Sequence, residues 1–292
     1  LLAVILIYFG YLNRKHLSGK WQINLSSLSR LLFAELVIML LAVLAGSRLS
    51  SMQPPVRADN GVLDNGLVIA GVSTPEAPNL WRLISLYDPD ALMIAVLVTA
   101  VALYIRGVVL LTRRGDKWPV GRTVAFALGI SAVDYATSGG LGVYAKFSFE
   151  YHMVAHMVLG MIAPIGIVLG APITLALRTL PQGRNQEERG VRGTLIALLH
   201  SKPAGVITNP VTILALFDGS LFALYMTPLF GNMMQSHLGH LVMTVHFLLA
   251  GILFFHVIIG IDPNPRKVPY IVRIVILFAA MSIHAFFAVA LI

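Results

Sequence analysis

Apolar residues are gathered in long runs that alternate with short polar segments along the chain. Several runs reach about 20 residues, the length that a helix needs to cross about 30 Å of hydrocarbon. None shows the alternation of polar and apolar positions over ~10-residue segments that a transmembrane barrel requires. The pattern predicts eight apolar helices, at residues 1–12, 28–50, 90–112, 119–137, 151–178, 208–226, 237–260 and 269–292.

The segment 51–89 breaks this pattern, because it contains five prolines and mixed charges. Such a composition is typical of an extramembrane linker, here with a short interfacial piece around Trp81. The linker separates two predicted spans from a block of six. The chain also begins and ends inside apolar runs, so we expect it to be an internal segment of a longer protein.

The composition agrees with a membrane protein. Hydrophobic residues make up 57% of the chain and charged residues 12%, with a mean hydropathy of +0.82. A water-soluble domain could not bury that much apolar surface, and a disordered chain would contain far less of it. The expected fold class is therefore all-α, a polytopic helical membrane bundle with about eight apolar segments.

The net charge of +8 reports topology rather than nucleic-acid binding. If every apolar segment spans, 17 of the 21 Lys and Arg residues fall on one side of the membrane. Because basic residues are enriched in cytoplasmic loops, that side is predicted to be the cytoplasm. The linker and the loops 138–150 and 227–236 are then outside the cytoplasm of a multi-pass plasma-membrane protein.

Histidines and methionines are the side chains with candidate chemistry. The chain has no cysteine, and it lacks the sequence motifs of common hydrolases, P-loop proteins and dinucleotide enzymes, so we do not expect an enzyme. His152 and His156 are four residues apart and therefore share one helix face, where they can bind one metal ion. Met153 and Met157 repeat that spacing, and Met161 follows one turn later.

A second group of histidines opens the segment 237–260, which begins on the same side of the membrane as 151–178. His246 lies ~13 Å deeper than the first histidines at 1.5 Å per residue, and His284 reaches a similar depth from an outward-running span. We expect His156, His246 and His284 to approach a common polar interior. The candidate metal ligands are His152, His156, Met153, Met157, His237, His240, Met243, His246 and His284.

A set of imidazole and thioether donors without cysteine suits a soft ion, and copper(I) fits best, whereas zinc and haem iron stay open. Three acids lie in or near spans. Asp134, near an outer end, is expected to support a ligating histidine by a hydrogen bond. Glu35 and Asp218 are expected to pair with hydroxyl or backbone groups. Proline and glycine at 164 and 170–172 predict a kink in 151–178.

Several of these segments together resemble the integral-membrane CtaG-type cytochrome c oxidase assembly factors. The resemblance rests on Phe147–Met157, Leu169–Leu177, Leu199–Ser201, His237–His246, Gly260–Pro263 and His284–Phe287. It covers about residues 81–292 and implies a six-span domain that is cut short at its C-terminal end. Residues 1–50 resemble the last two spans of a CopD-type copper-resistance domain, an actinobacterial type of fusion, and residues 51–80 form the extracytoplasmic linker.

The resemblance implies a role in maturing an aa-type oxidase through delivery or insertion of copper. The implied partners are oxidase subunits, an extracytoplasmic copper chaperone and the lipid bilayer, with no nucleic acid. Three alternatives stay open: a b-haem electron carrier, a metal or small-solute transporter, and a scaffold of a respiratory complex whose histidines only join helices.

Overall fold

The computed structural model describes residues 37, 66, 72–183, 190–266 and 268–291. Contacts divide the chain into two units, and the larger, residues 61–235 and 239–292, contains almost all of the described residues. The predicted spans at 1–12 and 28–50, Glu35 and the CopD-like region lie outside the described residues, apart from residue 37.

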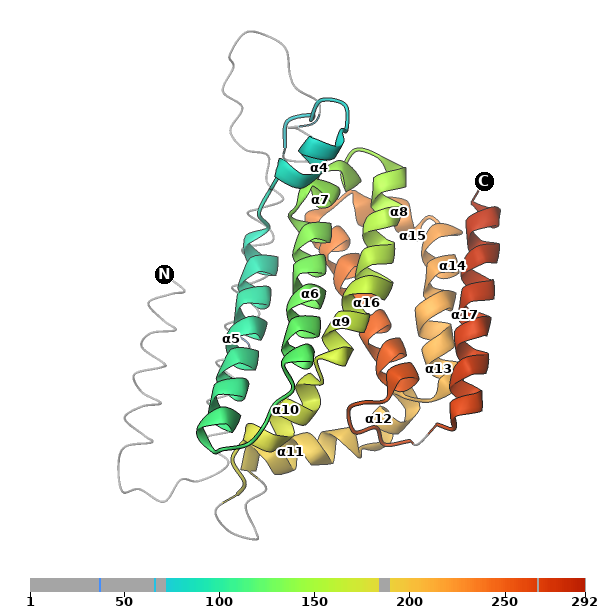
Figure 1. The fold of residues 1–292 in the computed structure, drawn as a ribbon. Coiled ribbons are helices and arrows are strands. Elements are labelled where there is room, and N and C mark those ends of the chain that lie inside the picture. Colours follow the sequence, from blue (N-terminus) through green and yellow to red (C-terminus); the bar gives the residue numbers. More distant parts are fainter. Residues whose placement is uncertain (1–36, 38–65, 67–71, 184–189, 267, 292) are drawn as a thin grey trace. The chain divides into compact units, whose positions relative to one another are not determined.

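Every regular element in the described part of the chain is a helix, which confirms the expected fold class. The long elements run between two ends of this unit (Figure 1). They are α5 (Ala91–Arg113), α6 (Val120–Thr137), the run α8 (Phe149–Met157), η1 (Val158–Ile162), α9 (Ala163–Leu169) and α10 (Pro172–Thr179), the run α13 (Pro210–Leu214), η2 (Ala215–Gly219) and α14 (Ser220–Tyr225), then α16 (His237–Ile259) and α17 (Tyr270–Ala290).

Short helices complete the unit. They are α4 (Leu80–Ser85), α7 (Gly140–Ala145), α11 (Gly190–Leu199), α12 (Lys202–Ile207) and α15 (Leu229–Met234). Figure 1 shows α4, α7 and α15 at one end of the unit and α11 and α12 at the other. The start of α8 lies at the first end, as the sequence topology predicts for the outer side.

Four helical segments are long and apolar enough to cross a membrane: Ala91–Arg113, Phe149–Thr179, Leu238–Ile259 and Tyr270–Ala290. Two further predicted spans form helices that do not meet this standard. The segment Pro210–Tyr225 is apolar but shorter, and the 18 residues of α6 include an arginine and an aspartate. The predicted boundaries of all six helical regions agree with the structure to within a few residues.

Glycines let the central helices approach closely. A Cβ atom on Gly129 of α6 would lie 2.6 Å from the backbone nitrogen of Ile167 on α9. On α16, a Cβ atom on Gly251 would lie 2.1 Å from the carbonyl oxygen of Gly160 in η1. Both distances are below any real contact, so the two crossings require glycine. Small residues at crossings are the common packing device of membrane helices.

The segment Phe149–Thr179 breaks between α9 and α10, as its Gly-Ala-Pro sequence predicts. Ala171 adopts the left-handed conformation, with φ of 49°. The backbone groups left over at the break have partners. The hydroxyl of Tyr104 donates to the carbonyl oxygen of Gly170 at 2.9 Å, and the amides of Ile173 and Thr174 donate to the carboxylate of Asp262.

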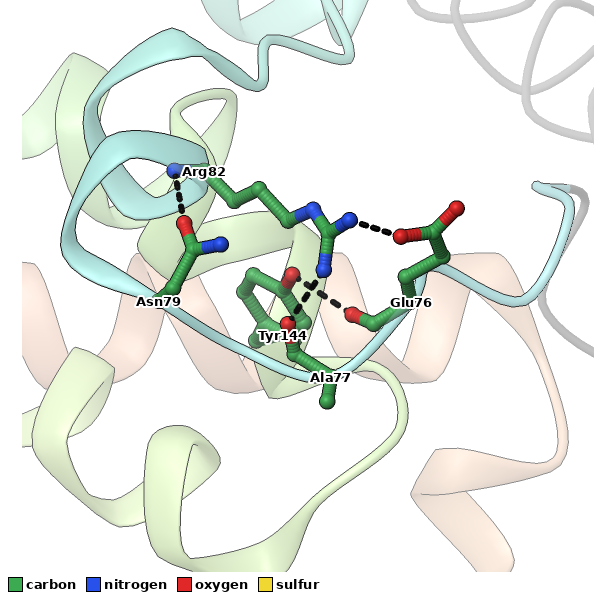
Figure 2. A network of polar contacts seen from close by, with 5 residues as sticks. All are labelled: Glu76, Ala77, Asn79, Arg82 and Tyr144. Atoms are coloured by element: carbon green, nitrogen blue, oxygen red, sulfur yellow. Dashed lines mark hydrogen bonds and ion pairs between the residues drawn. The ribbon is translucent and has the colours of Figure 1, made fainter.

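The residues just before α4 are fastened to the end of the unit that carries α7. Asn79 caps α4 by accepting a hydrogen bond from the backbone nitrogen of Arg82 at 2.8 Å (Figure 2). The Arg82 guanidinium pairs with the Glu76 carboxylate and donates to the carbonyl oxygen of Ala77. Tyr144 of α7 donates to the carbonyl oxygen of Glu76 at 2.9 Å. The sequence predicted a short interfacial piece around Trp81, and the structure forms the helix α4 there.

Candidate functional site

The predicted histidine pair forms on α8. The Nε2 atoms of His152 and His156 lie 2.9 Å apart, and the two side chains are only 2% and 3% exposed. The i, i+4 spacing brings both rings to one face, as expected. The Nδ1 atom of His156 is buried without a hydrogen-bond partner in the described part of the chain. A buried imidazole with an unpaired nitrogen is costly unless something else satisfies it.

A third imidazole comes from α16. The ring of His240 lies 5.9 Å from that of His152, measured between centroids, and His240 is half-buried. The prediction that α8 and α16 would bring their first histidines to one level is therefore confirmed for this pair of residues. The side chain of His237 lies outside the part of the chain that the structure describes.

Methionines adjoin these rings. Met243, one turn after His240, is 2% exposed in a cluster with Phe247, and Met153 of α8 packs against that cluster. Met233 and Met234 of α15 pack against it as well, although they were not among the predicted ligands. Their position, as two consecutive methionines shortly before a histidine-rich helix, was the sequence signal that could have identified them. We call Met153, Met233, Met234 and Met243 the methionine cluster. The half-buried Met157 is not part of it.

Aromatic rings enclose the histidine pair. Phe230 lies 5.4 Å from the ring of His152, and Tyr225 and Phe149 each lie 6.5 Å from it. Phe247 lies 4.5 Å from the ring of His156. These rings come from α8, α14, α15 and α16, so four helices close an apolar wall around two imidazoles.

The predicted meeting of His156, His246 and His284 is not found. His284 of α17 forms an ion pair with Asp218 of η2, and the Nε2 atom of His246 is buried without a partner among the described residues. Within the described ranges, no group of three or more His, Asp or Glu side chains is arranged to hold a metal ion. The expectation that Asp218 would pair with a hydroxyl or backbone group is also wrong, since η2 presents it to α17.

Asp134 contacts tyrosine rather than histidine. Its Oδ1 atom accepts a hydrogen bond from the Tyr87 hydroxyl at 3.1 Å. Desolvation, followed by this hydrogen bond, raises the pKa of Tyr87 above its ordinary value. The sequence predicted that Asp134 would support a metal-ligating histidine by a hydrogen bond. No such contact is observed among the described residues.

These observations define a class: a multi-pass helical membrane protein with a buried histidine pair beside a methionine cluster. The chain belongs to the Caa3_CtaG family, described as the cytochrome c oxidase caa3 assembly factor, whose sequence profile matches residues 102–292. Its resemblance to CtaG-type proteins is thereby confirmed, whereas the CopD-like character of residues 1–50 stays a prediction.

Three relatives show the same degree of similarity. They are uncharacterized proteins of Mycobacterium leprae, Mycobacterium bovis and Mycobacterium tuberculosis, each 42% identical over 224 residues. The match covers 77% of this chain but 34% of each relative. The chain thus corresponds to about a third of the length of these relatives. No solved structure matches the chain significantly.

Proposed function

We propose that this chain is part of a non-catalytic assembly factor for cytochrome c oxidase, which binds copper(I) and passes it to an oxidase subunit. The membership of the family supports the assembly role. The observation that carries the copper step is the buried pair of His152 and His156, whose Nε2 atoms point at one another. Copper is the cargo of this protein in the proposal rather than a resident cofactor.

The donor set suits a singly charged soft ion. Imidazole nitrogen and thioether sulfur are ligands that copper(I) accepts, whereas calcium and magnesium require oxygen. Metal–imidazole bonds are ~2.0–2.1 Å, so a small rotation of either ring from the 2.9 Å contact would admit an ion between the two nitrogens. Met153 or Met243 would then supply sulfur from the adjoining cluster.

Neutral ligands also favour release. The chain has no cysteine, and no described carboxylate forms an ion pair with His152 or His156, so no anion among the described residues would hold the ion by charge. His152 and His156 lie three and seven residues after the start of α8, which is ~5 and ~11 Å along the helix axis. With the predicted sidedness, copper would enter and leave from the extracytoplasmic side.

The contact geometry favours copper over b-type haem at this pair. A haem would need its plane between two imidazoles that bind opposite faces of the iron. Two rings on consecutive turns of one helix, with nitrogens 2.9 Å apart, leave no space for that plane. The haem alternative would then need other histidine pairs from different helices.

The test is metal analysis of protein purified from copper-supplied cells. We expect copper to be lost from the double variant His152→Ala/His156→Ala and retained in His200→Ala, whose ring is exposed near α12. Oxidase in cells with the double variant should lack copper while the variant protein is present at normal levels. Equal copper in all three proteins, or a Soret band in the purified protein, would overturn the proposal.

A further inference from the structure

A hollow of about 500 Å³ lies between α5 and α6, apart from the histidine pair. Its walls are almost entirely apolar and include Ile94, Val98 and Ile105 of α5 and Ile130 of α6. Val98 and Ile105 are 61% and 53% exposed. In a membrane this hollow would be a groove between two helices that opens toward the lipid at these exposed residues.

One end of the groove is polar. Tyr87, which precedes α5, and Asp134, near the end of α6, line it there and are joined by their hydrogen bond. The second carboxylate oxygen of Asp134 has no hydrogen-bond partner among the described residues. No described Lys or Arg forms an ion pair with Asp134. The carboxylate therefore has no counter-ion among the described residues and lies beside an apolar surface, and a cationic donor would satisfy it.

The dimensions correspond to one leaflet of a bilayer. Ile94 and Ile105 are 11 residues apart on α5, which is ~16 Å at 1.5 Å per residue. Half of the ~30 Å hydrocarbon thickness is ~15 Å. The polar end lies at the end of the unit that carries α4 and α7 (Figure 1), where a lipid headgroup would be. The groove thus begins at headgroup level and extends over the depth of one acyl chain.

We propose that this groove binds an aminophospholipid, phosphatidylethanolamine, with one acyl chain between α5 and α6 and its ammonium group on Asp134. The ammonium has three N–H donors, so it can reach the free carboxylate oxygen and balance its charge. An anionic lipid of equal chain length would fill the apolar groove but would meet the carboxylate with repulsion. The headgroup therefore decides which lipid is retained.

The experiment measures bound lipid by native mass spectrometry. The full chain is equilibrated in bilayers of equal parts phosphatidylethanolamine and phosphatidylglycerol and then released. Wild-type protein should retain phosphatidylethanolamine at least tenfold over phosphatidylglycerol. Asp134→Asn should lose the preference, and Asp116→Asn, whose carboxylate pairs with Arg178 elsewhere, should keep it.

A second pair of variants tests the groove itself. Val98→Trp fills the groove and should lower retention of both lipids about tenfold. Val96→Trp is the matched control, because Val96 is on the same helix, is 55% exposed and does not line the groove. Both variants must show wild-type helix content and gel-filtration behaviour. Equal retention by Val98→Trp and Val96→Trp, or no headgroup preference in the wild type, would overturn the proposal.

One specific competitor is the apolar segment predicted at residues 28–50, which could fill the groove in place of lipid. Variants with two cysteines, one at position 98 and the other at successive positions of that segment, test this directly, because the chain has no native cysteine. Efficient disulfide formation with residue 98, together with absence of bound lipid, would also overturn the proposal. The copper proposal predicts none of these outcomes, so the two fail separately.

Discussion

Asp262 offers the sharpest test of what stabilises the break between α9 and α10. It lies in the turn between α16 and α17 and is 4% exposed. Its carboxylate accepts hydrogen bonds from the backbone nitrogens of Ile173 at 3.2 Å and Thr174 at 2.8 Å, and from the Thr174 hydroxyl. The substitution Asp262→Ala removes the acceptor of two amides at the start of α10, in a place that the helix itself cannot satisfy.

The expected cost follows from those two amides. Each buried donor left without a partner costs about 1–3 kcal/mol, and the Thr174 hydroxyl can rotate to another acceptor. Allowing for some entry of water, we expect a loss of about 3 kcal/mol in the free energy of unfolding. In a chain of this size, a loss of 1 kcal/mol in the free energy of unfolding lowers the midpoint of thermal unfolding by about 2–4 °C. The midpoint of Asp262→Ala should therefore fall by about 6–12 °C.

The assay is thermal unfolding in detergent, followed by fluorescence-detected gel filtration. Asp88→Ala is the matched control, because that carboxylate pairs with Lys146 at 2.6 Å on a partly exposed surface and should contribute at most about 1 kcal/mol. Asp262→Asn keeps one acceptor oxygen and should fall between the two. A midpoint for Asp262→Ala within about 2 °C of that for Asp88→Ala would refute the idea that this carboxylate holds the break.

Three further outcomes are expected. Gly129→Val should prevent close packing of α6 on α9 and reduce the yield of folded protein severalfold, whereas Gly121→Val on the same helix meets no atom within 4 Å and should be tolerated. Single cysteines at Ser73 and Gln182 should react with impermeant reagents from opposite sides of the membrane, and reaction from the same side would reject the topology. Tyr104→Phe removes the hydrogen bond that the hydroxyl donates to Gly170 and the one that it accepts from Trp118, and should cost about 2 kcal/mol in the same thermal assay.

The sequence predicted the features that depend on local pattern. Apolar length placed α5, α16 and α17, and the Gly-Ala-Pro run marked the break at Ala171. The i, i+4 spacing placed His152 and His156 on one face, because an α-helix fixes that relation without reference to the rest of the fold. The approach of His240 followed from chain direction alone, since α8 and α16 begin at the same end.

Features that depend on tertiary packing were missed. The pairing of His284 with Asp218 requires the rotation of η2 relative to α17, and no residue spacing encodes that rotation. The addition of Met233 and Met234 to the methionine cluster depends on how α15 folds back after α14. Depth in the membrane was inferred from residue count, but depth does not fix which neighbour a ring meets.

The π-helical turn η1 has a consequence for how the chain can vary. Each π-type hydrogen bond joins residues five apart instead of four, so η1 contains one residue more than an α-helical turn would. Met161, which follows Met153 by eight residues and lies within this turn, packs against a different core, the cluster that contains Phe254. The π turn takes up this extra residue within one turn, so deleting one residue within 158–162 would restore a continuous α-helix and leave α9 close to its present orientation. A deletion in α8 or α9 would instead rotate everything beyond it by about 100°. The Gly160 carbonyl at the crossing with Gly251 is the part that a deletion in the π turn would move, so this turn is the point in the span where a change in length disturbs the remaining packing least.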